Sequence, residues 1–289
     1  MTDTMTNLLD IENLRVRFPT RQGHFDAVRG ISFSLRRERL GIVGESGSGK
    51  SMTGRAILKL IRKPGQITAD RMQMGGTNLL TASERQMRQI RGRHASMIMQ
   101  DPKFSLNPVM SVGQQITEAL LAHEKISRRD AKTRAIEMLD AVAIRSPDRV
   151  MDLYPHEVSG GMGQRIMIAM MLIPDPEILI ADEPTSALDV SVQLQVLEIL
   201  DKLVTDRGMG LIFISHDLNL VSNFCDRILI MYAGRVVEVC QAGRLHEAQH
   251  PYTRGLLNSV PDLEHPRPRL DVLKRDPAWA EAPSVSALT

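Results

Sequence analysis

The chain has 289 residues, of which 43% are hydrophobic and 24% are charged, so its composition is that of a globular protein with a sizeable core. Its 36 Lys and Arg residues nearly balance its 34 Asp and Glu residues, which gives no support to a nucleic-acid-binding protein with a concentrated basic face. The two cysteines, Cys225 and Cys240, suggest neither a disulfide framework nor a metal cluster, and we expect a reducing compartment.

The N-terminal stretch MTDTMTNLLDIENLRV lacks the basic and apolar regions of a signal peptide, so we expect none. We expect no transmembrane helix either, because no apolar run reaches roughly 20 residues. Beyond the N-terminal residues, apolar side chains occupy every second position over residues 14–18 and again over residues 31–35. This period of two predicts an antiparallel ribbon.

Four short apolar runs follow, and each is typical of a strand that is buried on both faces. They are LGIVG (40–44), ASMIMQ (95–100), EILIAD (177–182) and GLIFIS (210–215). Because helical patterns lie between these runs, the sequence predicts an α/β fold with a parallel sheet.

Three further segments complete the predicted organisation. Residues 101–165 carry mostly helical patterns, which predicts a helical subdomain inserted between strands of the sheet. DRILIMYAGRVVEV (226–239) predicts a hairpin that turns at Ala233 and Gly234. Residues 261–289 are rich in proline, charge and small polar side chains, so we expect a poorly ordered C-terminal tail.

One motif predicts a phosphate-binding loop, because GESGSGKS (44–51) lies between a predicted strand and a predicted helix. Its glycines let backbone amides face phosphate oxygens, its lysine adds a positive charge, and its last serine can bind Mg²⁺. A chance Gly/Ser loop would not have this strand–loop–helix context. The predicted nucleotide-binding residues are Gly44, Glu45, Ser46, Gly47, Ser48, Gly49, Lys50 and Ser51.

Polar side chains at the ends of three other buried strands are candidates for binding Mg²⁺, the attacking water and the γ-phosphate. Asp182 would hold Mg²⁺ and Glu183 would polarise the attacking water, although an acidic pair can also cap a helix. His216 would contact the γ-phosphate, against the alternative of a structural histidine. Gln100 would touch Mg²⁺ or the water, against the alternative of a solvated side chain.

A second anion site is predicted at VSGGMGQR (158–165), where Ser-Gly-Gly precedes a helical pattern that is rich in methionine. A helix that starts this way presents bare backbone amides and the positive end of its dipole. The alternative interpretation is a plain glycine hinge.

The motifs together resemble those of the ATPases of ABC transporters, over about residues 8–260. In chain order they are GESGSGKS, Gln100, VSGGMGQR, ILIADEP, SALD (186–189) and His216. Longer stretches, such as MQDPKFSLNP, YPHEVSGGM and HPYTRGLL, resemble the group that imports dipeptides, oligopeptides and nickel. The resemblance implies one ABC ATPase domain at 8–260, with ATP as substrate, Mg²⁺ as cofactor and the tail at 261–289 outside it.

The resemblance also implies residue roles that the motifs alone do not give. Two ATPase subunits would pack head to tail, so that Ser159, Gly160 and Gly161 grip the ATP of the partner. Phe18, or as an alternative Phe25, would stack on the adenine. The usual glutamine of the signature is replaced by Met162, which this importer group often shows, and Gly163 stands where a larger side chain is commoner.

By the same resemblance, the chain would be the energy-coupling subunit of a bacterial importer on the cytoplasmic face of the inner membrane. Its partners would be a second, different ABC ATPase, two permease subunits and, indirectly, a solute-binding protein, with Phe104–Pro108 on the permease. Peptides are the first choice of solute, and nickel or an opine-like compound is the alternative. A soluble ABC ATPase that acts on ribosomes or DNA is the non-transport alternative, and an exporter ATPase is a further one. We expect no iron–sulfur cluster, because no cysteine follows HPYTRGLL.

Overall fold

The computed structural model describes residues 7–100, 105–186, 188–259, 273 and 275–288. The chain divides into two compact units, one made of residues 1–82 and 212–289 and the other of residues 83–211. Both units combine helices with strands, which confirms the predicted α/β class. In the described part of the chain, no helix is both long and apolar enough to cross a membrane.

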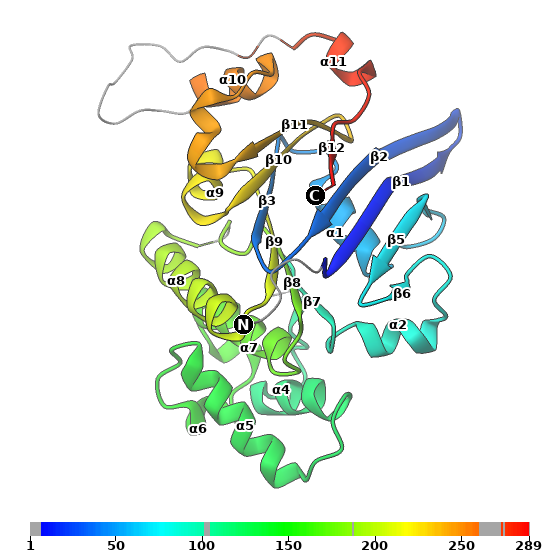
Figure 1. The fold of residues 1–289 in the computed structure, drawn as a ribbon. Helices are drawn as coiled ribbons and strands as arrows, with labels where there is room; N and C mark the ends of the chain where they lie inside the picture. The colour runs from blue at the N-terminus through cyan, green and yellow to red at the C-terminus, as the bar shows by residue number, and fades with distance from the viewer. Residues whose placement is uncertain (1–6, 101–104, 187, 260–272, 274, 289) are drawn as a thin grey trace. The chain divides into compact units, whose positions relative to one another are not determined.

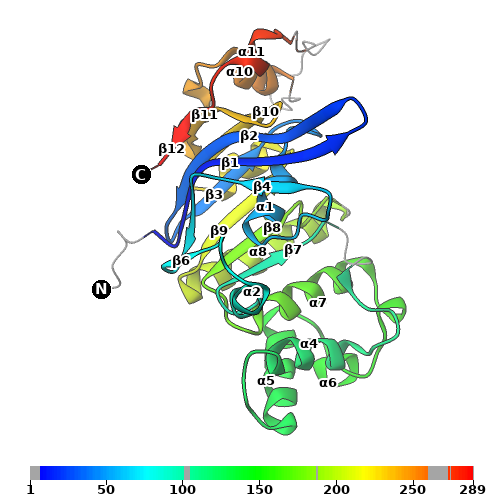
Figure 2. The same cartoon turned by 90° about the vertical axis from the view of Figure 1, so that its right-hand side faces the viewer.

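The first unit begins with the predicted antiparallel ribbon, made of β1 (Leu9–Thr20) and β2 (Gly23–Leu35). The alternating apolar side chains are buried, and Val16 on β1 lies opposite Val28 on β2. The sheet continues from β1 to β5 (Arg71–Met74) and β6 (Thr77–Asn78) (Figure 1). β4 (Gln66–Thr68) also pairs with β1 (Figure 2).

A second sheet in this unit contains the strands that frame the phosphate-binding loop. Its order is β11 (Arg235–Gln241), β10 (Arg227–Tyr232), β3 (Arg39–Val43) and β9 (Gly210–Ser215). β3 and β10 are parallel, whereas β10 and β11 form the predicted hairpin. Ala233 and Gly234 have φ angles of 46° and 80°, which is the left-handed turn that a tight hairpin requires.

The C-terminal residues of the described chain include one short helix and one short strand. After α9 (Leu218–Phe224), η2 (Ala242–Glu247) and α10 (Pro251–Asn258), residues 275–288 form α11 (Ala278–Glu281) and β12 (Ser286–Ala287). β12 adds to the ribbon beside β2, in parallel (Figure 2). Backbone pairing and an aromatic cluster hold residues 275–288. Residues 260–272 lie outside the described ones, and the expectation of a poorly ordered tail at 261–289 stays a prediction.

The second unit carries two parallel strands, β7 (Ala95–Ile98) and β8 (Ile178–Asp182), whose residues are all buried. α2 (Glu84–Ile90) precedes β7. The predicted helical segment holds α4 (Val112–Leu121), α5 (Arg128–Ala141), α6 (Pro147–Val150) and η1 (Pro155–Glu157) (Figure 1). α7 (Gly160–Leu172) begins inside the predicted range and runs past its end, and α8 (Val190–Arg207) follows β8.

Candidate nucleotide site

The phosphate-binding loop connects the end of β3 to the start of α1 (Lys50–Ile57), and its path depends on glycine. Gly44, Gly47 and Gly49 have φ angles of 155°, 80° and 100°. A Cβ atom at Gly44 would lie 2.1 Å from the carbonyl oxygen of Met231, and one at Gly49 would lie 2.5 Å from that of Ala27. At Gly47 a Cβ would meet nothing within 4 Å. The loop is thus enclosed on one side and open at Gly47.

The lysine of the loop is buried beneath it. Lys50 is only 5% exposed, and its Nζ donates to the carbonyl oxygens of Gly44 (2.7 Å) and Glu45 (2.9 Å). Ser48 Oγ is buried and has no hydrogen-bond partner among the described residues. A buried hydroxyl without a partner is costly, and a phosphate oxygen is the acceptor that would satisfy it. The loop therefore fits a phosphate ligand.

In the second unit, the ends of β7 and β8 bring two predicted residues together. Ile98 on β7 lies opposite Ala181 on β8, so the residues that follow these strands are neighbours. Gln100 Nε2 donates to Glu183 Oε2 over 3.1 Å. Glu183 has a φ angle of 49°, a left-handed conformation that non-glycine residues rarely adopt and that is common at functional sites.

Asp182, at the end of β8, is only 2% exposed, which is unusual for a carboxylate. The predicted metal ligands are thus a hydroxyl (Ser51), a carboxylate (Asp182) and an amide (Gln100), which offer the hard oxygen donors that suit Mg²⁺. Among the described residues, no cluster of three or more His, Cys, Asp and Glu side chains could hold a metal ion. Binding of Mg²⁺ by these residues stays a prediction.

His216 comes directly after β9 in the first unit and is exposed. The next residue, Asp217, caps α9 by accepting from the backbone N–H of Leu220 over 3.0 Å. The cap fixes the backbone beside the histidine, and contact between His216 and a phosphate stays a prediction.

The Ser-Gly-Gly segment is a helix N-terminus, as its composition predicted. Ser159 caps α7, with its Oγ accepting from the backbone N–H of Met162 over 3.3 Å. Gly163 donates its backbone N–H to the carbonyl oxygen of Ser159 over 2.8 Å, so glycine at this position does not prevent the first helical turn. A Cβ at Gly160 would meet nothing within 4 Å, whereas one at Gly161 would lie 2.7 Å from Val192 Cγ1. The amide end of α7 is therefore accessible at Gly160.

The two candidate adenine-stacking rings have different surroundings. Phe18 is half-buried and lies against Gly65, where an added Cβ would be 2.7 Å from Phe18 Cε1. Phe25 is 58% exposed and lines a hollow of about 340 Å³ that also includes Gly47 of the phosphate-binding loop. Of the two rings, Phe25 has the open face beside the loop.

Sequence reasoning missed two residues that hold the loop from the C-terminal part of the first unit. Tyr252 accepts a hydrogen bond from the backbone N–H of Glu45 over 3.1 Å, and Arg275 forms a two-point ion pair with the Glu45 carboxylate. HPYTRGLL marked Tyr252 only as part of a resemblance. The partners are 207 and 230 residues apart in sequence, and no spacing rule connects them.

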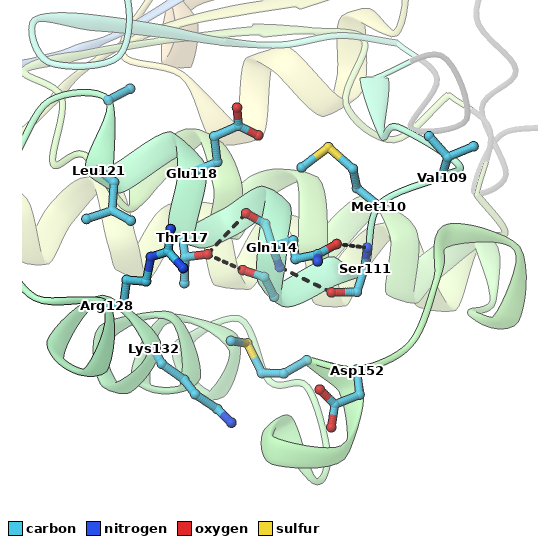
Figure 3. A pocket seen from close by; sticks show the side chains of 13 residues that line it. Val109, Met110, Ser111, Gln114, Thr117, Glu118, Leu121, Arg128, Lys132 and Asp152 are labelled. Atoms are coloured by element: carbon cyan, nitrogen blue, oxygen red, sulfur yellow. Dashed lines mark hydrogen bonds between the residues drawn. The ribbon is translucent and has the colours of Figure 1, made fainter.

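The second unit also has an open groove of about 1060 Å³ along α4 (Figure 3). Its apolar members include Val109, which is 79% exposed, and Leu121. Arg128 and Lys132 of α5 supply positive charge. Ser111 and Gln114 form a capping box that fixes the start of α4 in its wall. Glu118 and Asp152 also line the groove, which thus combines exposed apolar surface with charges of both signs.

Comparisons with known proteins agree with this geometry. Residues 28–186 match the family model described as ABC transporter. The chain is 48% identical to the oligopeptide transport ATP-binding protein OppD of Bacillus subtilis, over 90% of this chain and 74% of that protein. It is 46% identical to the dipeptide transport ATP-binding protein DppD of Haemophilus influenzae, over 92% and 82% respectively. A solved dimeric structure of the ATP-binding cassette MJ0796 with ADP and phosphate has a TM-score of 0.70 at 24% identity, over 81% of this chain and 98% of that one.

Proposed function

The chain belongs to the ABC transporter family, and we propose that it is the ATP-binding, energy-coupling subunit of a membrane importer that takes up peptides. The observation that carries the proposal is the phosphate-binding loop, whose buried Lys50 and buried, unpartnered Ser48 hydroxyl fit the phosphates of ATP. Relatives named for oligopeptide and dipeptide transport support peptides as the solute.

The predicted site residues have separate roles in ATP hydrolysis in this proposal. Lys50 and the loop amides bind the phosphates, because a buried ammonium and aligned N–H groups complement their charge. Glu183 accepts the proton of the attacking water, and Gln100, which already donates to Glu183, orients this carboxylate. His216 contacts the γ-phosphate. Ser51, Asp182 and Gln100 would hold Mg²⁺, which when bound neutralises charge on the phosphates.

The exposed N-terminus of α7 supports a role toward a second nucleotide. Gly160 has open space around its Cα, and the positive end of the helix dipole lies there. We assign Ser159, Gly160 and Gly161 to the ATP of a partner ATPase, and the peptide group implies a different chain as that partner. Two such subunits would drive two permease subunits, served by a solute-binding protein.

The groove along α4 supports the contact with the permease. The chain runs from Gln100, which is hydrogen-bonded to Glu183, to Val109 at the groove within a few residues. A permease segment bound in the groove would thus contact residues that lie close in sequence to Gln100, which orients the proposed base Glu183. Of the predicted contact segment, Phe104 lies outside the described residues, and Ser105–Pro108 lead directly into Val109. The subunit would bind the cytoplasmic face of the inner membrane through this contact.

Uptake by intact cells tests the function. Deletion of the gene should abolish uptake of labelled di- and oligopeptides, and a plasmid copy should restore it. Loss of nickel uptake with normal peptide uptake would instead establish the alternative solute. Normal uptake of both would reject an importer of this group and favour the non-transport alternative.

Co-purification tests the permease contact. Val109→Asp should reduce recovery of the permease with this subunit, because a charge would be buried in an apolar contact. Leu60→Asp is a matched control, since Leu60 is 40% exposed in the other unit. Equal recovery with both variants would remove the groove from the proposal.

A further inference from the structure

We propose that Tyr252 is a positioning residue for the phosphate-binding loop that supports the affinity for ATP, and that Arg275 and Trp279 tie the C-terminal segment 275–288 to the same loop, with a smaller effect on that affinity. The inference rests on the proposed function and deepens it, because it assigns to the C-terminal segment a role in nucleotide binding.

Glu45, the second residue of the loop, is held from three sides within the first unit. Its backbone N–H donates to the Tyr252 hydroxyl over 3.1 Å, and its carbonyl oxygen accepts from Lys50 Nζ over 2.9 Å. Its carboxylate pairs with Arg275 at 2.5 and 3.2 Å. The contact through Lys50 links Glu45 directly to the group that binds phosphate, so a shift of Glu45 would move the ammonium.

Tyr252 is placed rigidly. It is fully buried at the second position of α10, and the N-cap His250 accepts from the Tyr252 backbone N–H through Nδ1 over 3.1 Å. Glu238 on β11 accepts from the backbone N–H groups of Gln249 (2.6 Å) and His250 (3.2 Å). Pro251 opens the helix, where its fixed φ is favourable. The hydroxyl is therefore aimed at Glu45 by a helix start that is itself hydrogen-bonded to the sheet.

An aromatic cluster connects Tyr252 to the C-terminal segment. The Tyr252 ring lies 4.6 Å from that of Tyr232 and 6.2 Å from that of Trp279 on α11, between ring centroids. Trp279 also contacts Tyr232 and His250, at 6.0 and 5.7 Å. Such aromatic pairs contribute about 0.5–1.5 kcal/mol each beyond their burial. Figure 1 shows α10 and α11 on the same side of β10 and β11.

Further contacts anchor the segment on the C-terminal side of Trp279. The carbonyl oxygen of Ala280 accepts from Arg29 (2.8 Å) and Arg235 (3.0 Å). Val285 donates its N–H to the carbonyl oxygen of Val236 over 2.8 Å. Arg227 donates to the carbonyl oxygen of Ala287 over 2.8 Å. Arg275 therefore extends from an anchored segment and not from a free end, which keeps its guanidinium near Glu45.

Nucleotide titration of the full chain tests the proposal. Tyr252→Phe keeps the ring and removes the acceptor of the partly buried Glu45 N–H, and we expect ATP affinity to fall about tenfold. Tyr232→Phe is the matched control from the same cluster, and its affinity should stay within about twofold of wild type. Arg275→Gln should lower affinity about twofold at low salt only, because this ion pair is largely exposed and screened by salt.

A second readout separates positioning from simple destabilisation. The Tm without nucleotide should differ little between Tyr252→Phe and Tyr232→Phe, whereas the Tm increase with ATP should be smaller only for Tyr252→Phe. If wild type binds ATP and Tyr252→Phe binds it with equal affinity, the role of Tyr252 is overturned and the proposed function is not affected. A wild-type chain that binds no ATP would overturn the proposed function as well.

Discussion

Two glycine-containing segments of this chain each lie at the N-terminus of a helix, but their surroundings differ. The loop at residues 44–49 is closed in by Met231, Ala27 and the buried Lys50 of its own unit. The second segment, residues 158–161, has no such cover at Gly160; its serine caps α7 and its glycines open that helix. A loop that is held in shape by its own unit is suited to bind the nucleotide of this subunit. An accessible helix N-terminus suits a ligand that another molecule presents.

The largest expected effect is on the rate of ATP hydrolysis and comes from Glu183, which lies in neither of the two segments. Glu183→Gln should lower ATP turnover by about 10²–10⁴-fold while ATP still binds, because an amide cannot accept the proton of water. Steady-state ATPase activity of the assembled transporter measures this effect. Glu177→Gln, at the other end of the same strand, is the control. Substantial turnover in Glu183→Gln would exclude Glu183 as the base.

Removal of the charge beneath the first loop should be the next largest effect. Lys50→Ala should weaken ATP binding to the isolated chain about 10–100-fold, since a charge-assisted contact contributes about 1.5–3 kcal/mol. A fluorescent ATP analogue measures the affinity. Lys202→Ala, an exposed lysine on α8, should bind as wild type does. Unchanged affinity in Lys50→Ala would break the comparison, because the enclosed loop would then not be the nucleotide site.

A substitution in the second segment should separate the two segments most directly. Ser159→Arg should leave ATP affinity of the isolated chain within about twofold and lower ATPase activity of the assembled transporter at least about tenfold, by filling the anion site at α7. Ser127→Arg removes a matching N-cap from α5 and controls for the lost cap. If both variants lower activity equally, the effect of Ser159→Arg is on the helix and not on a partner's nucleotide.

The smallest effect should discriminate between the two aromatic candidates. Phe25→Ala should weaken ATP binding about fivefold through the loss of one ring contact, and Phe18→Ala should weaken it less. Phe25 has the exposed ring next to Gly47, whereas Phe18 packs on Gly65. Titration with ATP and with inorganic triphosphate measures whether the loss depends on the adenine. A larger effect of Phe18→Ala would return the stacking role to Phe18.

Local patterns predicted most elements, because the patterns arise from burial within each element. The buried runs that contain Leu40, Ile98, Ile180 and Phe213 became β3, β7, β8 and β9. The turn at Ala233 and Gly234 was predictable from the need for positive φ. Composition gave no sign of the contacts of residues 275–288, since Arg275 and Trp279 are held by partners on β10, on α10 and in the phosphate-binding loop, distant in sequence.

The sequence by itself determined the phosphate-binding loop, the strands that precede the candidate site residues and the helix start at Ser159. These features depend on neighbouring residues: glycine dihedral angles, alternating burial and a side-chain cap. Tertiary structure alone decided that Gln100 donates to Glu183, that Phe25 rather than Phe18 has the open ring, and that Tyr252 and Arg275 hold Glu45. Each of these contacts joins side chains whose separation in space depends on the packing of whole elements, which no local spacing encodes.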